Sequence, residues 1–136
     1  MKIMICGSMY FSKEMLEAKD FLEKKGHDVM VPDDVHDCLN NPELNADFNF
    51  CVKNNIDKKC FDKVAKSDAI VVLNHPKDNI KGYVGGATLM EIGIARHLDK
   101  KIFLLHELPS EEEQRHALEI KLTKPVILNG DLSKVI

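Results

Sequence analysis

Residues 67–98 read SDAIVVLNHPKDNIKGYVGGATLMEIGIARHL, and this stretch decides the fold. Its β-branched run from Ala69 to Leu73 is typical of a buried parallel strand, in which both faces of the strand are covered. After Gly82–Gly86, the sequence predicts a helix that reaches about Leu98. A buried strand, a glycine-containing loop and a helix in this order form the repeating unit of an α/β fold.

The same alternation continues on both sides of this stretch. Further strands are predicted at Lys2–Cys6, Asp28–Pro32, Ile102–Leu105 and Val126–Leu128. Further helices are predicted from Ser12, as the cap, to about Lys25, from Val52 to about Lys66, and over Glu111–Leu122. The polar residues up to about Phe50 have no clear period and predict a loop, with or without a short helix. We therefore expect an α/β three-layer sandwich of the Rossmann-like or flavodoxin-like type, with a five-stranded parallel sheet and helices on both faces.

Length and composition limit the class of protein. At 136 residues, with 44% hydrophobic and 30% charged residues, the chain has the size and composition of one globular domain, residues 1–136. No apolar run approaches the about 20 residues of a membrane-spanning helix, so we expect no membrane partner. The net charge is −3 and basic residues are interleaved with acidic ones, which argues against nucleic acid as a partner.

The cysteines and the N-terminus indicate a reducing, cytoplasmic location. The four cysteines form no CxxC pair, so the sequence predicts neither a disulfide framework nor a zinc knuckle. His36–Asp37–Cys38 lacks a second pair at ligand spacing, and we therefore predict no metal site. The opening residues MKIMICGSM become polar too early for a secretory signal.

The carboxyl edge of the predicted sheet is where a ligand is expected. In open parallel sheets ligands bind beyond the carboxyl ends of the strands, near the point where the strand order reverses. The loops at this edge are Gly7–Met9, Pro32–Asp34, Asn74–His75 with Gly82–Glu91, and His106–Glu107. Neither GxGxxG nor GxxxxGK[ST] occurs, so we expect no dinucleotide, no P-loop and no other cofactor.

Gly7 and Ser8 directly follow the first strand and precede a helix. They offer close backbone approach, a hydroxyl and a nearby helix N-terminus, a combination that favours an anion. A tight strand-to-helix turn is an equally good interpretation of the same two residues. His75 and His106 follow strands at the same edge, where each could donate to a ligand or remain a solvated loop residue.

Glu91 is the residue in the glycine-rich segment that most needs an explanation. On a helix it shares one stripe with Thr88 and Ala95 rather than with the charged residues nearby. If the helix begins at Thr88, Glu91 completes a capping box with that residue. If the helix begins near Gly85, the Glu91 carboxylate is free to face a ligand. Tyr83, close to Gly85, is a candidate to stack on a base.

Three segments together resemble one family: CGSM, SDAIVVLN and GYVGGATLMEIGIARHLDKKIFLL. They are similar to the nucleoside 2-deoxyribosyltransferase-like superfamily, which includes 2'-deoxynucleoside 5'-phosphate N-hydrolases. The resemblance covers Met1 to about Leu105, and the glutamate-bearing segment is its most specific part. It implies a Rossmann-like fold, a homodimer or larger homo-oligomer, and cleavage of the N-glycosidic bond of a small-molecule nucleoside or nucleotide.

The resemblance also implies roles for individual residues. The family's nucleophile lies in a segment of the form G-x-E-x-G-x-A, which Met90–Ala95 matches from its second position on, with Glu91 at the position of the nucleophile. The residues expected to bind the sugar, phosphate or base are Gly7, Ser8, Met9, Asn74, Tyr83, Gly85, Gly86 and Thr88. The chain departs from the family at Cys60, eight residues before Asp68, where related enzymes tend to have an aspartate near the departing base. Asp57, one turn earlier, is a possible substitute for that acid.

Three functional hypotheses follow. The first is an N-glycosidase or deoxyribosyltransferase that uses Glu91. The second is a phosphoribohydrolase of the cytokinin-activating type. Such enzymes have a GG-x-GT-x-x-E loop, and the segment GGATLME of this chain approximates that loop with one residue fewer. The third is a nucleotide-binding protein without turnover, which the cysteine at position 60 favours.

Overall fold

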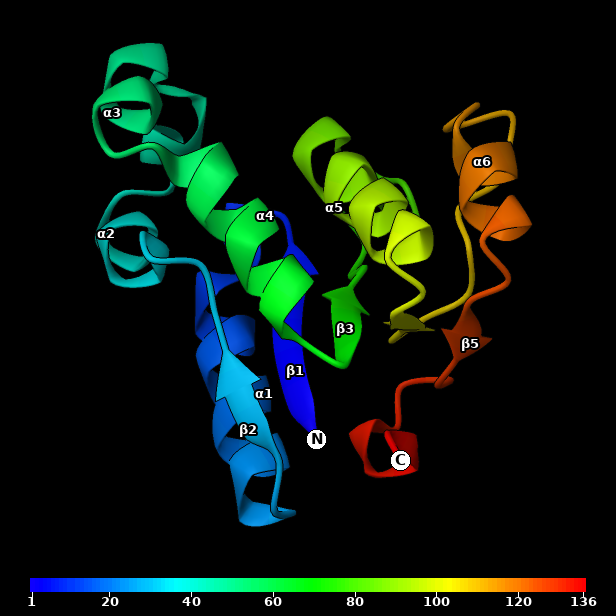
Figure 1. Cartoon of the computed structure of the whole chain (residues 1–136). Helices are drawn as coiled ribbons and strands as arrows, with labels where there is room; N and C mark the ends of the chain where they lie inside the picture. The colour runs from blue at the N-terminus through cyan, green and yellow to red at the C-terminus, as the bar shows by residue number, and fades with distance from the viewer.

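Five parallel strands form one sheet in the order β2-β1-β3-β4-β5 in the computed structural model, which describes residues 1–136 (Figure 1). The strands are β1 (Lys2–Gly7), β2 (Asp28–Met30), β3 (Ala69–Leu73), β4 (Lys101–Leu104) and β5 (Val126–Ile127). The strand order reverses between β1 and β3, which is the flavodoxin-like arrangement. The predicted fold class is confirmed, and the predicted strand ends differ from the observed ones by at most two residues.

Helices cover both faces of this sheet, so the fold has three layers. Helix α1 (Ser12–Lys24) packs on one face, where Ile3 and Ile5 of β1 contribute to a core with Met15 and Leu22. Helices α4 (Ile56–Lys66), α5 (Gly86–His97) and α6 (Ala117–Leu122) cover the other face. Met4, Cys6 and the alternate residues of β3 contribute to the core on this side. Alternation along a doubly covered strand explains why every residue of β3 is buried.

The segment predicted as a loop up to about Phe50 is largely helical. It contains α2 (Val35–Asn40), a 3-10 turn at Pro42–Ala46 and α3 (Phe48–Lys53). The helix predicted from Val52 is therefore wrong at its start: α3 ends at Lys53, and α4 begins at Ile56. Asn55 between them has a φ of 52°, a left-handed conformation that asparagine tolerates and that interrupts the helix.

Two predicted helix starts are also corrected. Ser12 does not cap α1, because a 3-10 turn at Met9–Phe11 precedes the helix and Phe11 occupies the cap position. Ser8 caps this turn instead, since its Oγ accepts a hydrogen bond of 3.3 Å from the Tyr10 amide. The last helix begins at Ala117 rather than at Glu111. The residues before it form turns from which Gln114 and His116 contact Val84 in the loop after β3.

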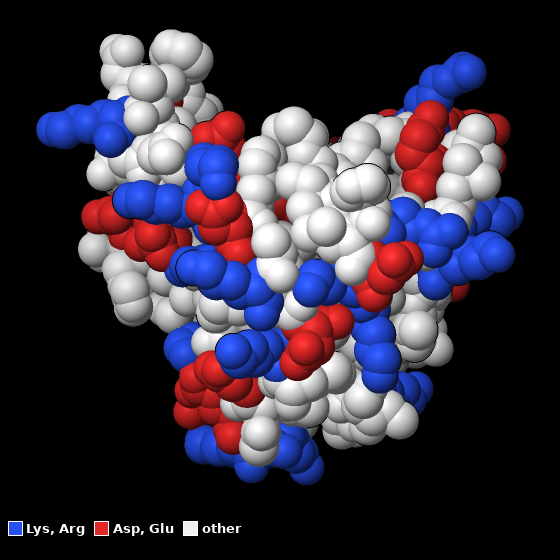
Figure 2. Space-filling model, viewed as in Figure 1, with Lys and Arg blue, Asp and Glu red and all other residues white.

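Charged side chains of both signs are interleaved over the face of the molecule in Figure 2. None of the helices combines the length and the apolar character that crossing a membrane requires.

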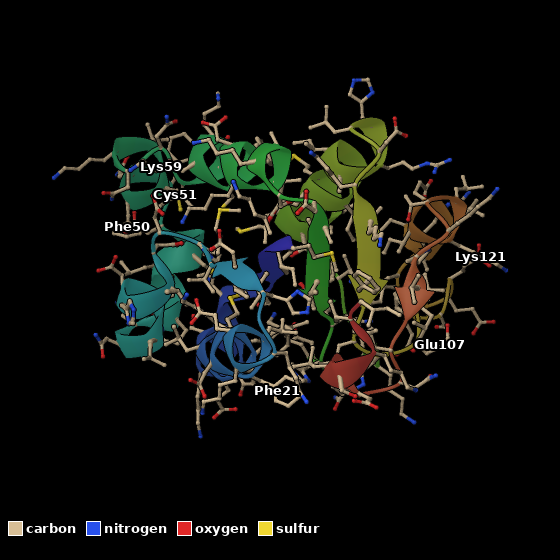
Figure 3. The ribbon with its side chains drawn as sticks, turned by 60° about the horizontal axis from the view of Figure 1, so that its bottom comes forward. Phe21, Phe50, Cys51, Lys59, Glu107 and Lys121 are labelled. Atoms are coloured by element: carbon tan, nitrogen blue, oxygen red, sulfur yellow. The ribbon has the colours of Figure 1, made fainter.

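In Figure 3, Phe50, Cys51 and Lys59 lie on the side formed by α3 and α4, far from Glu107 and Lys121. All four cysteines are free, and Cys51 is the one that is not fully buried.

Candidate functional site

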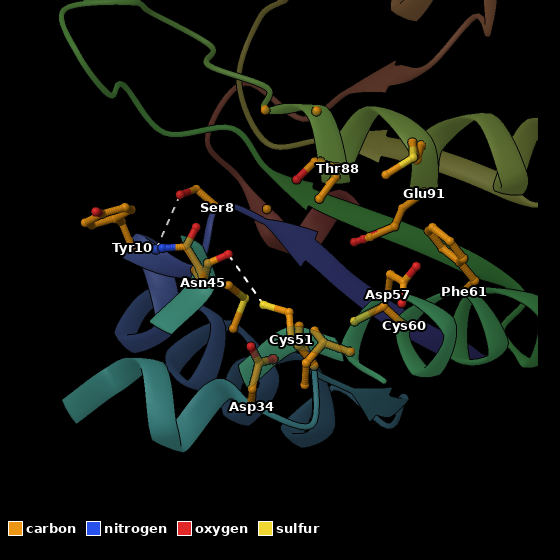
Figure 4. A pocket seen from close by; sticks show the side chains of 18 of the residues that line it. Ser8, Tyr10, Asp34, Asn45, Cys51, Asp57, Cys60, Phe61, Thr88 and Glu91 are labelled. Carbon is orange, nitrogen blue, oxygen red and sulfur yellow. Dashed lines mark hydrogen bonds between the residues drawn. The ribbon is translucent and has the colours of Figure 1, made fainter. Parts of the chain in front are cut away.

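A cavity of about 410 Å³ lies at the carboxyl edge of the sheet, where the strand order reverses between β1 and β3 (Figure 4). Segments at the ends of three strands line it. They are Gly7–Tyr10 at the end of β1, Pro32 and Asp34 after β2, and Lys77, Tyr83, Gly85–Thr88, Met90 and Glu91 after β3. Residues of α3 and α4 form the remaining wall. The volume lies within the range of small-molecule sites, and the position is the one that the strand order predicts.

Backbone and side-chain contacts hold the loop between β3 and α5 in place. Gly82 has a φ of 70°, and a Cβ at this position would collide with the Glu107 carbonyl oxygen. The Val84 amide donates to Oε1 of Gln114 at 2.8 Å, and Nε2 of His116 donates to the Val84 carbonyl at 2.7 Å. These contacts direct Tyr83 and Gly85 toward the cavity.

Helix α5 begins at the cavity without a side-chain cap. Gly85 is the N-cap residue, and the Leu89 amide donates to its carbonyl at 2.9 Å. The helix therefore starts two residues before Thr88, and Glu91 lies in its second turn. A capping box between Thr88 and Glu91 is thus wrong, because the helix does not begin at Thr88. The amides of the first turn are left for a ligand or for water.

The Glu91 carboxyl is buried on the cavity wall. The residue is only 6% exposed, and its Oε2 has no hydrogen-bond partner. Burial, and secondly the charge of Asp34, raises the pKa of the Glu91 carboxyl to about 8. In the empty cavity at neutral pH, Glu91 is therefore mostly protonated.

Asp34 brings a second buried carboxyl to the cavity. It is 2% exposed, and its Oδ2 accepts a hydrogen bond of 3.4 Å from Sγ of Cys38, whereas its Oδ1 has no partner. Sequence reasoning selected the loop Pro32–Asp34 but did not single out this residue. Its neighbour Asp33 differs in environment, because it is exposed and pairs with Lys63 of α4.

Lys77 is the one basic residue among those that line the cavity. Its Nζ lies 4.9 Å from the centre of the Tyr10 ring and 4.6 Å from that of the Tyr83 ring. The same Nζ is 3.0 Å from Oδ2 of Asp78. Two aromatic rings and a carboxylate therefore hold a single cation near the start of α5.

Most of the residues selected from the sequence line this cavity. Those that do so are Gly7, Ser8, Met9, Tyr83, Gly85, Gly86, Thr88 and Glu91. Asn74 does not, contrary to prediction, because its fully buried amide is used elsewhere. Its Oδ1 accepts from the His106 amide at 2.8 Å, and its Nδ2 donates to the carbonyls of His106 and Glu107. Asn74 therefore joins the ends of β3 and β4.

Cys60, Asp57 and Asp68 lie in three different environments. Cys60 packs in the core and touches the cavity, and burial, followed by the charge of Glu91, raises the pKa of its thiol to about 12. Asp57 also reaches the cavity but is exposed on α4. Asp68 lies at the opposite edge of the sheet, where its Oδ2 accepts from the Lys2 amide at 2.7 Å.

His75 and His106 are neither free in solvent nor part of the cavity wall. Their rings are joined by a contact of 3.2 Å between Nδ1 of His75 and Nε2 of His106. Burial and the neighbouring His106 lower the pKa of His75. The pair lies beside Asn74 and contributes to the same junction between the ends of β3 and β4.

The fold is similar to that of a solved structure, the CMP N-glycosidase BcmB of Clostridium botulinum. The TM-score is 0.52 at 21% sequence identity, and the match covers 98% of this chain and 93% of that chain. The two chains share an α/β fold. No protein-family model matches the sequence, and no curated protein matches it. At this level of identity the likeness concerns the fold alone.

Proposed function

We propose that this protein cleaves the N-glycosidic bond of a nucleoside 5'-monophosphate, with Glu91 as the nucleophile. The observation that carries the proposal is the Glu91 carboxyl itself, which is buried in a cavity of nucleotide size and has an oxygen without a hydrogen-bond partner. A buried carboxyl with no structural partner is costly and is typical of a catalytic group. The similarity to a CMP N-glycosidase in fold and the resemblance of GYVGGATLMEIG to deoxyribosyltransferase-like enzymes support the same chemistry.

A single phosphate matches the end of the cavity near the start of α5. The Lys77 ammonium, the Ser8 hydroxyl and the uncapped amides at Gly86 and Ala87 are all groups that favour an anion. The rest of the wall contains the acids Asp34, Asp57 and Glu91, which disfavour additional negative charge. A monophosphate is therefore preferred over a di- or triphosphate.

Glu91 acts in this scheme as an ionised carboxylate. It attacks the anomeric carbon through an oxocarbenium-like transition state, and the base departs. The resulting sugar ester is then resolved by water, or by a second base if the enzyme transfers the sugar. Because positive charge develops on the sugar in the transition state, the transition state favours the ionised form of Glu91.

The test is release of free base from a panel of nucleosides and their 5'-monophosphates. Ribose and 2'-deoxyribose forms are both included, with and without an acceptor base, so that hydrolysis, transfer and ribonucleotide preference are separated. We expect turnover of at least one monophosphate that is lost in Glu91→Gln and retained in Glu119→Gln, an exposed control on α6. An intact panel, or an active Glu91→Gln variant, contradicts the proposal.

Binding without turnover is the second candidate. The thiol of Cys60 stays protonated at neutral pH, and so does Glu91 in the empty cavity, so that neither supplies an anion before substrate binds. Under this alternative, calorimetry detects a tight complex with a monophosphate that remains intact for hours. The base-release panel distinguishes the two candidates directly.

A further inference from the structure

We propose that Asp34 is a second catalytic residue, which protonates the departing base while Glu91 attacks the anomeric carbon. The proposal rests on the proposed N-glycosidase activity and assigns a role to a residue that the resemblance to deoxyribosyltransferase-like enzymes does not include. Asp34 lies on the wall of the same cavity as Glu91, and one of its buried carboxyl oxygens has no hydrogen-bond partner. This observation carries the proposal.

The two carboxyls belong to different walls of the cavity. Asp34 precedes α2 after strand β2, whereas Glu91 projects from α5 after strand β3. Figure 4 shows Glu91 and Asp34 on opposite sides of the opening. A substrate between them presents one side of its glycosidic bond to each carboxyl. Two carboxyls arranged around a scissile glycosidic bond are the usual requirement for this chemistry.

Other groups on the wall are less suited to donate a proton. Asp57 is exposed on α4 and is solvated. Burial raises the pKa of the Cys60 thiol to about 12 and also raises that of Cys51, so neither thiol gives up its proton readily. Lys77 is held between two tyrosine rings and Asp78, at the end of the cavity assigned to the phosphate.

Asp34 is held through one of its two carboxyl oxygens. The Cys38 thiol donates to Oδ2, and the buried Val35 starts α2 directly after it, which restricts movement of the side chain. Oδ1 is left without a partner in the protein. Oδ1 is also buried, so a base must enter the cavity directly beside it to exchange a proton with this oxygen.

The proton and electron balance of the two steps is complete. When substrate binds, the single proton of the pair moves from Glu91 to Asp34. In the first step, the Glu91 carboxylate forms a bond to the anomeric carbon, and the carbon–nitrogen bond breaks with its electron pair going to the base, which takes the proton from Asp34. In the second step, Asp34 accepts a proton from water as the water oxygen attacks the anomeric carbon. The ester bond then breaks, which returns Glu91 as a carboxylate and Asp34 as an acid.

The pair therefore needs one proton between its two members. Cys6 and Cys60 are influenced by the charge of Glu91, and Cys38, Cys51 and Cys60 by that of Asp34. Asp57 lies on the same cavity wall, whereas Lys63 and Asp33 act on Cys60. Burial, followed by the charge of Asp34, raises the pKa of the Glu91 carboxyl to about 8. Glu91 therefore keeps its proton through neutral pH and loses it above about pH 8.

The activity test compares Asp34→Asn with Asp37→Asn, an exposed aspartate of α2 that does not line the cavity, over pH 5–10, with folding checked by circular dichroism. We expect kcat of Asp34→Asn to fall by about 10²–10⁴-fold, with KM changed far less, as for loss of a general acid. Asp37→Asn should remain within about twofold of the wild type, because its carboxyl is exposed and lies outside the cavity wall. In the wild type, kcat/KM should decline above about pH 8, and this decline should be absent from the residual activity of Asp34→Asn.

A titration that does not depend on turnover completes the test. Carboxyl NMR of protein labelled in glutamate gives the Glu91 pKa, with the signal assigned from Glu91→Gln. Replacement of Asp34 by asparagine should lower this pKa, because a neighbouring charge is removed. An unchanged Glu91 pKa, or a kcat of Asp34→Asn near that of an active wild type, overturns the role of Asp34 and leaves the proposed function standing. A wild type that releases no base from any substrate overturns the proposed function instead.

Discussion

Gln114 accepts a hydrogen bond of 2.8 Å from the backbone amide of Val84, thirty positions earlier in the chain. His116 binds the carbonyl of the same residue through its Nε2 at 2.7 Å. Val84 is buried inside the GYVGG segment, so these two side chains satisfy both polar groups of a backbone unit that has no strand partner. The turn before α6 thereby fixes the loop that carries Tyr83 and Gly85 to the cavity.

Replacement of Gln114 by leucine should loosen this loop. The Val84 amide loses its acceptor in a buried setting, which costs about 1–3 kcal/mol of unfolding free energy. Urea denaturation measures this loss, and amide exchange should accelerate at residues 82–86. Glu112→Gln is the exposed control from the same turn and should leave both unchanged. Unaltered exchange at residues 82–86 in Gln114→Leu would show that the loop is held by other contacts.

Stability should fall between pH 4.5 and 8 because of Glu91. The pKa of this carboxyl is raised from 4.5 to about 8 by burial and then by Asp34, so in that window the folded protein keeps a proton that the unfolded chain releases. The unfolded state is favoured as pH rises, and the shift corresponds to a loss of a few kcal/mol. Glu91→Gln removes this titration, so its stability relative to the wild type should increase from pH 5 to pH 8.

Urea denaturation of both proteins at several pH values provides the measurement. Glu119→Gln is the matched control, since this exposed carboxyl on α6 should not alter the pH dependence. Parallel pH profiles for the wild type and Glu91→Gln would contradict a raised Glu91 pKa.

Lys77 should determine preference for a nucleotide over a nucleoside. Loss of a charged hydrogen-bond donor costs about 1.5–3 kcal/mol, so Lys77→Gln should raise KM for a 5'-monophosphate by about 10–100-fold. KM for the corresponding nucleoside should change little, because it has no phosphate. Lys81→Gln removes an exposed lysine of the same loop and is the control. Equal effects of Lys77→Gln on nucleotide and nucleoside would contradict a phosphate contact.

The sequence predicts the sheet and the glycine-rich segment well, because local patterns determine both. The run Ala69–Leu73 has the observed bounds of β3, since a strand buried on both faces is apolar throughout. The Glu91 stripe on α5 likewise follows from helical spacing. Asp34 could not be distinguished from Asp33 in this way, because the direction of two adjacent aspartates depends on how the turn enters α2. The position of the Asn74 side chain could not be predicted either, since its partners His106 and Glu107 lie more than thirty positions away in the sequence.

Gly82 should be the glycine of the site least tolerant of substitution. Its φ of 70° is left-handed, which costs another residue about 1–2 kcal/mol, and a Cβ would also collide with the backbone carbonyl of Glu107. Gly82→Ala should therefore lose at least about 2 kcal/mol of stability by urea denaturation. Gly93→Ala is the matched control: Gly93 lies within α5, a Cβ there meets nothing within 4 Å, and the change should stabilise the protein by up to about 1 kcal/mol. Equal stabilities of the two variants would mean that the loop can move away from Glu107, and that the contact does not restrict the cavity.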